Sequence, residues 1–276
     1  MTDAEADVER RRVTAGDLRE MKREGERIAV LTCYDHLFAR LLDGAGLDVV
    51  LVGDSVGQVV LGHDSTLPVT VDEMIHHASA VRRGLEGPLL VVDMPFLSYQ
   101  PSDAEAVRQG GRILKESGAE AVKLEGGNEQ ARSRTRALVS SGIPVMGHLG
   151  LTPQSVHRWG GYGVRGRGEE GERIRRRARE LEEAGCFALV LEMVPTSLAR
   201  EVTADLEIPT IGIGAGPACD GQVLVLPDML GLNEGFEPRF LRKFAELAGD
   251  VRGAVIDYIG AVKEGDYPSP EESYDG

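Results

Sequence analysis

Eight short apolar runs, separated by longer amphipathic stretches, constrain the fold of this 276-residue chain more than any other feature. Each run is rich in Val, Ile and Leu and has the length of a buried β-strand. The expected strands span residues 27–33, 48–53, 88–93, 120–125, 144–149, 187–192, 209–214 and 221–226. Strands that alternate with helices form parallel sheets, and eight of them favour a closed (β/α)8 TIM barrel over an open doubly wound sheet.

Helical patterns fill five of the intervening segments, and several of these end at Gly, where a helix commonly stops. They are residues 34–46, 70–85, 102–118, 129–142 and 169–185. Ser102 and Glu105 have the spacing of a capping box, in which each side chain bonds to the other residue's backbone N–H. Only 5% of residues are aromatic, so the core must be mainly aliphatic, which favours an α/β fold over an aromatic-rich β-sandwich.

The overall charge and the cysteines exclude several classes of protein. A net charge of -14 argues against nucleic-acid binding, because an acidic surface repels phosphates. Cys33, Cys186 and Cys219 lie far apart, which indicates neither a disulfide framework nor a zinc site. The N-terminal stretch "MTDAEADVERRR" lacks an apolar signal core, and no apolar run approaches the roughly 20 residues of a membrane span. We therefore expect a soluble, cytoplasmic protein with no membrane partner.

Ionisable side chains stand at the ends of five consecutive expected strands. They are Asp54, Asp93, Lys123 with Glu125, His148 and Glu192. A single acid in such a position is more often a helix cap or a solvated loop residue. In a barrel, however, the carboxyl ends of all strands meet on one face, where side chains distant in sequence surround a common pocket. Five such ends in succession favour a shared active site.

The residue types at these ends indicate a metal-dependent reaction. Asp54, Asp93 and Glu125 offer hard oxygen ligands without nearby Cys pairs, which favours Mg²⁺ or Mn²⁺ over zinc. Crowded carboxylates also need a cation or protons to neutralise them. Lys123 lies two residues before Glu125 and therefore points to the same side of its strand. It could stabilise a substrate carboxylate or an enolate oxygen, form a Schiff base, or pair with one of the acids.

Two further side chains and one loop leave alternatives open. Glu192 follows an uninterrupted apolar strand, which favours a desolvated carboxylate that acts as a general base; a structural pair with an Arg is the alternative. His148 could bond to substrate, orient a ligand or simply be packed. Residues 160–168, "GGYGVRGRG", could form a mobile lid or a surface turn.

Seven stretches, in order, together resemble the ketopantoate hydroxymethyltransferase family, from roughly residue 13 to 268. They are "TCYDHLFARLLDGAGLDVVLVGDSVG", "GHDSTLPVTVDEM", "VVDMPFLSY", "VKLEGG", "GHLGLTPQS", "LVLEMVP" and "IGIGAG…CDGQVLV". The resemblance implies a barrel of the phosphoenolpyruvate/pyruvate type that uses Mg²⁺. It implies transfer of a hydroxymethyl group from 5,10-methylenetetrahydrofolate to 3-methyl-2-oxobutanoate, through a Mg-stabilised enolate. The products would be 2-dehydropantoate and tetrahydrofolate, in pantothenate and coenzyme A biosynthesis.

The resemblance also assigns roles to individual residues. Asp54 and Asp93 would hold the metal, with Glu125 contributing directly or through water. Substrate contacts would come from Asp54, Ser55, Asp93, Lys123 and His148. Glu192 would be the catalytic base, and Lys123 would stabilise the enolate. The family's ring-like decamers imply a homo-oligomer.

The expected organisation is a charged N-terminal extension (residues 1–12), a single catalytic barrel (13–268) and a C-terminal tail (269–276). Two other functions remain open. One is a metal-dependent C–C lyase or mutase of the phosphoenolpyruvate and isocitrate lyase type, which would be expected to carry a Cys in its mobile loop. The other is a catalytically silent barrel, against which the set of strand-end ionisable groups argues.

Overall fold

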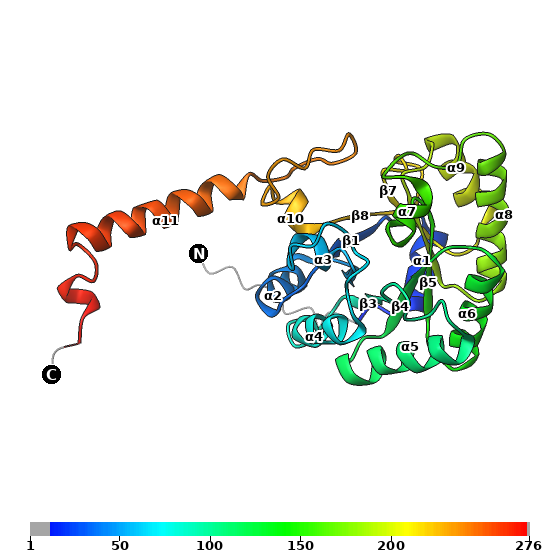
Figure 1. The fold of residues 1–276 in the computed structure, drawn as a ribbon, viewed down its shortest axis with the longest axis horizontal. Coiled ribbons are helices and arrows are strands. Elements are labelled where there is room, and N and C mark those ends of the chain that lie inside the picture. Colours follow the sequence, from blue (N-terminus) through cyan, green and yellow to red (C-terminus); the bar gives the residue numbers. More distant parts are fainter. Residues whose placement is uncertain (1–11, 275–276) are drawn as a thin grey trace. The chain divides into compact units, whose positions relative to one another are not determined.

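All eight expected strands are present, and they form one closed parallel barrel with the strands in chain order (Figure 1). The computed structural model describes residues 12–274. The strands are β1 (Ile28–Thr32), β2 (Val49–Val52), β3 (Leu89–Asp93), β4 (Ala121–Glu125), β5 (Val145–Gly150), β6 (Ala188–Glu192), β7 (Thr210–Ile213) and β8 (Gly221–Leu224). Pairing of β1 with β8 closes the ring. The predicted TIM barrel is therefore confirmed.

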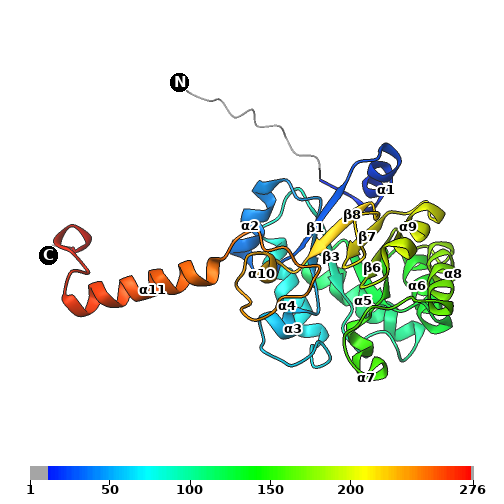
Figure 2. The ribbon, with the colours of Figure 1, turned by 90° about the horizontal axis from the view of Figure 1, so that it is seen from above.

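Helices accompany these strands, most of them around the outside of the barrel, whereas Leu18 of the first helix packs into the interior cluster (Figure 2). They are α1 (Ala15–Glu24), α2 (His36–Ala45), α3 (Val56–Val59), α4 (Val71–Arg82), α5 (Asp103–Ser117), α6 (Glu129–Ser140), α7 (Val156–Trp159), α8 (Glu169–Glu183) and α9 (Thr196–Asp205), with a 3-10 turn, η1 (Pro153–Ser155). The five predicted helices are α2, α4, α5, α6 and α8. Residues 214–220, between β7 and β8, contain no helix, in agreement with the sequence, which shows no helical pattern there.

The predicted capping box at α5 is only half formed. Ser102 Oγ accepts a hydrogen bond from the Glu105 N–H at 3.1 Å, as expected. The Glu105 carboxylate, however, binds Arg108 at 2.6 Å instead of returning to the Ser102 backbone. A guanidinium that engages both carboxylate oxygens is a stronger partner than one neutral N–H, which explains the difference.

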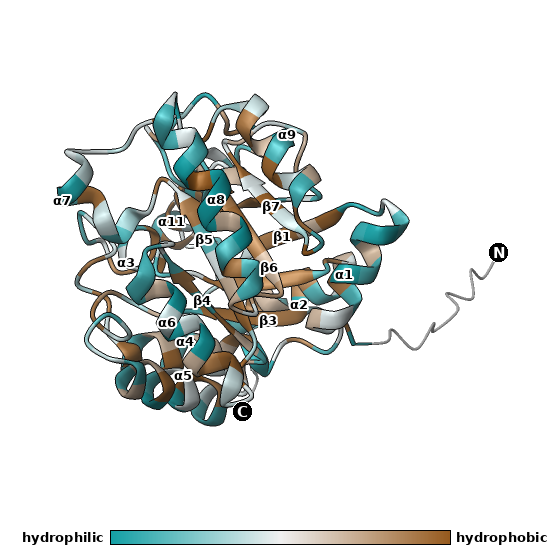
Figure 3. Ribbon diagram, turned by 90° about the vertical axis from the view of Figure 1, so that its right-hand side faces the viewer, coloured by the Kyte–Doolittle hydropathy of each residue, from teal (hydrophilic) through white to brown (hydrophobic). Residues whose placement is uncertain are grey.

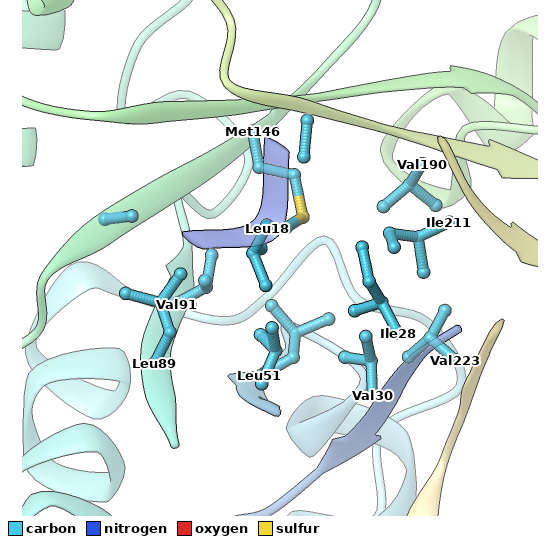
Figure 4. Packing of buried hydrophobic residues seen from close by; sticks show 13 residues of the cluster. Leu18, Ile28, Val30, Leu51, Leu89, Val91, Met146, Val190, Ile211 and Val223 are labelled. Carbon is cyan, nitrogen blue, oxygen red and sulfur yellow. The ribbon is translucent and has the colours of Figure 1, made fainter. Parts of the chain in front are cut away.

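The apolar interior of the barrel explains why its polar residues gather at one end (Figure 4). A buried cluster contains Leu18, Ile28, Val30, Val49, Leu51, Leu89, Val91, Ala121, Met146, Ala188, Val190, Ile211 and Val223. Side chains two apart on a strand point the same way, so Asp93 follows Val91 into the interior and Lys123 follows Ala121. Figure 3 shows the contrast between largely hydrophobic strands and the hydrophilic outer surface of α8.

Contacts divide the chain into two compact units, one up to Val225 and one from Leu226 onward. The second unit contains α10 (Leu226–Met229), α11 (Leu247–Glu264) and a 3-10 turn, η2 (Pro270–Glu272). The single catalytic domain over residues 13–268 stays a prediction. The predicted N-terminal extension, apart from Arg12, and residues 275–276 of the predicted tail lie outside the described residues. Between residues 12 and 274, none of the helices is both long and apolar enough to cross a membrane.

Candidate active site

The ends of β2, β3 and β4 bring two carboxylates and an ammonium group into direct contact. The backbone N–H of Asp54 donates to Asp93 Oδ2 at 3.0 Å. Lys123 Nζ lies 2.9 Å from Asp93 Oδ1. Pairing with an acid was one of the alternatives for Lys123, and this ion pair is present. All three side chains are buried. The predicted convergence of strand ends thus holds for these residues.

His148 connects this group to Glu192. Its Nδ1 lies 3.3 Å from Lys123 Nζ, and its Nε2 lies 3.1 Å from Glu192 Oε2. A lysine ammonium can only donate, so Nδ1 must accept and the proton of a neutral imidazole resides on Nε2. Burial, followed by the positive charge of Lys123, lowers the pKa of His148, which keeps the ring neutral. His148 Nε2–H therefore faces the Glu192 carboxylate at 3.1 Å.

Glu125 adds a third buried acid to the site. Its Oε1 lies 3.7 Å from His148 Nδ1. Burial raises the pKa of Glu125 well above its usual range, and the charge of Asp54 raises it further. Burial and the neighbouring charge of Asp93 also raise the pKa of Asp54 to about 7. The carboxylates at this end of the barrel therefore tend to take up protons unless a cation neutralises them.

Lys123 is the cation that these acids surround. Although burial lowers the pKa of a lysine, the charges of Asp93, Glu125 and Asp54 outweigh it and raise the pKa of Lys123 above its usual range. A lysine that stays protonated is a poor nucleophile for Schiff-base formation. It is well suited to stabilise negative charge on an oxygen.

Ser55 lies at the turn that follows β2, with Oγ 2.8 Å from the Tyr34 hydroxyl. Gly53, just before Asp54, makes this close packing possible. A Cβ atom at position 53 would lie 2.8 Å from Ser55 Oγ and 3.5 Å from Asp93 Oδ2. The turn therefore brings its polar groups together because residue 53 has no side chain.

Glu192 is less buried than its apolar strand predicts. Its side chain is 17% exposed, compared with 4% for His148. The carboxylate is thus largely but not fully removed from solvent, because Glu192 is the last residue of β6. The next residue, Met193, has a φ of 49°, an unfavourable conformation for a non-glycine residue that occurs preferentially at functional sites.

Gln154, which sequence reasoning missed, bridges two of the acids. Its side-chain Nε2 donates to Asp54 Oδ2 at 2.9 Å and to the Met94 carbonyl oxygen at 2.9 Å. Its backbone N–H donates to Glu125 Oε2 at 3.0 Å. Through these bonds one buried residue fixes carboxylates that come from β2 and β4. The sequence signal is weak, because Gln154 lies in the turn η1 beyond the end of β5.

Tyr99 holds Gln154 in place and was also missed. Its hydroxyl lies 2.9 Å from Gln154 Oε1 and accepts a hydrogen bond from the Glu125 N–H at 3.1 Å. Burial raises the pKa of Tyr99 well above its usual range, so the hydroxyl keeps its proton and can donate to the amide oxygen. Tyr99, Gln154 and Glu125 thus form a connected polar network behind the strand ends.

The loop of residues 160–168 approaches this site. The Tyr162 side chain forms a hydrogen bond with Gln58. Burial raises the pKa of the Tyr162 phenol, and the negative charges of Glu192 and Asp54 raise it further. The Arg165 N–H donates to the Met193 carbonyl oxygen at 2.8 Å. This position suits a lid, although a lid motion stays a prediction.

The donor set has the chemistry that Mg²⁺ requires. Magnesium keeps several waters and is usually bound by one or two carboxylates together with substrate oxygens. Asp54 and Asp93 provide such a pair, and their charge is only partly balanced by Lys123. Among the residues from 12 to 274, no three His, Cys, Asp or Glu side chains form a complete protein-only metal site. The residues therefore fit a metal that shares its ligands with water and substrate.

Comparison with known proteins connects this geometry to one family. The model of the family described as "Ketopantoate hydroxymethyltransferase" matches residues 12–270. A 3-methyl-2-oxobutanoate hydroxymethyltransferase of Syntrophus aciditrophicus strain SB is 55% identical over 265 residues, covering 96% of this chain and 97% of the relative. The enzyme of the same name from Cytophaga hutchinsonii is 53% identical over 275 residues, covering 99% of this chain and 100% of the relative.

Solved structures with much lower identity share the fold. A phosphonopyruvate hydrolase in complex with oxalate and Mg²⁺ has a TM-score of 0.62 at 12% identity, covering 94% of this chain and 93% of that chain. A 2,3-dimethylmalate lyase of the PEP mutase/isocitrate lyase superfamily has a TM-score of 0.57 at 18% identity, covering 93% of this chain and 92% of that chain. These similarities support the (β/α)8 fold alone.

Proposed function

The chain belongs to the ketopantoate hydroxymethyltransferase family, and we propose that it transfers a hydroxymethyl group to 3-methyl-2-oxobutanoate. The proposed donor is 5,10-methylenetetrahydrofolate, and the products are 2-dehydropantoate and tetrahydrofolate. The contact of His148 with both Lys123 and Glu192 carries the proposal, because it connects a base to a cation across the barrel mouth. The relatives that are more than half identical over nearly the whole chain carry the name of the transferase, which argues against both the lyase and the catalytically silent barrel.

Glu192 is the proposed base that removes the proton from C3 of the α-keto acid. Its partly exposed carboxylate can reach a bound substrate, while the N–H of His148 faces it. As the proton leaves, negative charge develops on the keto oxygen, and the protonated Lys123 stabilises it. The resulting enolate carbon forms the bond to the donor's methylene carbon, and water supplies the hydroxyl oxygen. Both carbon–nitrogen bonds of that methylene group break, and the two nitrogens of tetrahydrofolate take up the C3 proton and one proton of the water.

Asp54 and Asp93 are the proposed metal ligands, with Glu125 acting directly or through water. Bound Mg²⁺ would supply Lewis-acid polarisation of the substrate carbonyl. Ser55, beside Asp54, can offer its backbone N–H or hydroxyl to the substrate carboxylate. Lys123 pairs with Asp93 and lies in the same pocket, which suits contact with the keto oxygen.

Replacement of Gln154 by Ala is expected to weaken Mg²⁺ binding by about 10- to 100-fold, because residues that orient metal ligands have effects of this size. The change removes the amide that donates to Asp54 but leaves the backbone N–H that donates to Glu125. Isothermal titration calorimetry with Mg²⁺ measures the change in affinity directly. Gln100→Ala is the matched control, since Gln100 contacts the Gln154 amide oxygen and neither acid. Equal Mg²⁺ affinity in Gln154→Ala and wild type would contradict this role.

The transfer reaction itself tests the proposed function. The purified protein, given 3-methyl-2-oxobutanoate, methylenetetrahydrofolate and Mg²⁺, should form 2-dehydropantoate and tetrahydrofolate in equal amounts. Absence of both products with well-folded protein would overturn the proposal. The homo-oligomer, a decamer by family resemblance, stays a prediction that light scattering can test.

A further inference from the structure

A cavity of about 470 Å³ lies beside the catalytic residues, and Glu125 and Gln154 form part of its wall. The rest of the wall comes from the loops after β3 and β4, the first half of α6, the segment after β5 and the first half of α8. This volume is within the range of small-molecule sites. Five arginines line the cavity but only two glutamates, in a chain whose net charge is -14. We refer to it as the arginine cavity; its arginines are Arg134, Arg158, Arg165, Arg173 and Arg177.

Three of these arginines have no acidic partner. Arg134 pairs with Asp103, and Arg165 pairs with Glu170. Within residues 12–274, neither Arg158, Arg173 nor Arg177 forms an ion pair. Arg158 and Arg173 are exposed, so water screens their mutual repulsion, but an anion in the cavity would be attracted by all three cations.

Local packing holds two of these cations at the cavity wall. Arg173 and Arg177 are four residues apart on α8 and therefore lie on the same face of the helix. The stem of Arg177 packs against Gly127, where a Cβ atom would lie 3.0 Å from the Arg177 Cβ. Burial, together with the charges of Arg173, Arg176 and Arg158, lowers the pKa of Arg177. The guanidinium of Arg177 is thus kept close to other cations.

An aromatic ring completes the wall. The guanidinium carbon of Arg165 lies 4.1 Å from the ring centroid of Trp159, and that of Arg158 lies 5.0 Å from it. Trp159 is the only tryptophan in the chain, so its fluorescence reports on this cavity alone.

We propose that the arginine cavity binds the carboxylates of the glutamate tail of the one-carbon donor. This inference rests on the proposed function. The donor's methylene carbon must meet the substrate near Glu192 and Glu125, and the cavity extends from Glu125 to Arg173 and Arg177. The planar fork of an arginine matches a carboxylate, and each further γ-linked glutamate adds one carboxylate to the tail. The cavity is therefore a specificity site for donors with long glutamate tails.

Donors with one and with three glutamates test the site. In wild type, the KM of triglutamyl methylenetetrahydrofolate should be about tenfold lower than that of the monoglutamyl donor, the effect of one additional charged hydrogen bond. This preference should disappear in the double variant R173Q/R177Q. The control R176Q should keep the preference, because Arg176 is on α8 outside the cavity and contacts Glu180. Equal KM values for both donors in wild type, or a preference that survives in R173Q/R177Q, would overturn the proposal.

Fluorescence separates this proposal from the proposed function. Free γ-linked triglutamate, which has no chromophore, should change Trp159 emission saturably in wild type and R176Q but not in R173Q/R177Q. Absence of a change in wild type would overturn the site, whatever the enzyme catalyses. Loss of deuterium exchange at C3 of 3-methyl-2-oxobutanoate in R173Q/R177Q would indicate a disturbed active site and would also count against it. Absence of that exchange in wild type, with the triglutamate signal intact, would reject the proposed function and keep the anion site.

Discussion

Glu192→Gln is expected to lower kcat by about 10²- to 10⁴-fold, the usual contribution of a general base. The amide has the shape of the carboxylate but cannot take a proton from C3 of the substrate. Its amide oxygen can still face His148 Nε2–H, which lies 3.1 Å from the carboxylate, so the barrel mouth should keep its structure. Steady-state kinetics with saturating α-keto acid and donor measure the loss.

A surface carboxylate provides the control for Glu192→Gln. Glu183, the last residue of α8, is exposed and lies outside the site, so Glu183→Gln should retain wild-type kcat. Retention of more than about a tenth of wild-type turnover by Glu192→Gln would remove Glu192 from the role of base.

Asp93→Asn should have the second large effect, a loss of Mg²⁺-dependent turnover of at least about 100-fold. The carboxylate of Asp93 is the partner of Lys123 at 2.9 Å and a proposed metal ligand. An amide oxygen is a weaker ligand for a hard cation, although it can still accept the Asp54 N–H. The measurement is the rate as a function of Mg²⁺ concentration, together with Mg²⁺ affinity by calorimetry.

Asp103→Asn is the matched control for Asp93→Asn. Asp103 is an acid at the start of α5 whose carboxylate contacts Arg134 and Ser133, so its loss should leave Mg²⁺ affinity unchanged. Unchanged Mg²⁺ affinity in Asp93→Asn would show that the metal, if required, binds elsewhere.

The barrel could be predicted because its strands are buried on both faces. Continuous Val, Leu and Ile runs such as Val49–Val52 have little other explanation, and every expected strand is present to within two residues. The expected strands leave only residues 215–220 between β7 and β8, so a short connection there agrees with the sequence. How the end of this loop is held could not be predicted: the Asp220 carboxylate accepts the Thr210 N–H at 2.8 Å. This contact depends on tertiary structure and has no periodic signal.

The candidate site was predictable where strand geometry decides it. Alternation along a strand places Asp93, Lys123 and Glu125 in the barrel interior, and the closed barrel brings them together. Contacts made by loops were not predictable. Gln154 and Tyr99 reach the acids only because the segments after β5 and β3 fold over the strand ends, and one polar residue in a loop does not indicate such a contact.

Deuterium exchange at C3 of 3-methyl-2-oxobutanoate, followed by proton NMR in D₂O without any folate, tests the central claim most directly. The claim is that this site forms an enolate by removing the C3 proton with Glu192. Wild type with Mg²⁺ should exchange the proton, and exchange should fall to the uncatalysed rate after treatment with EDTA and in Glu192→Gln. Exchange that is absent in wild type, or that persists undiminished in Glu192→Gln, would contradict the account.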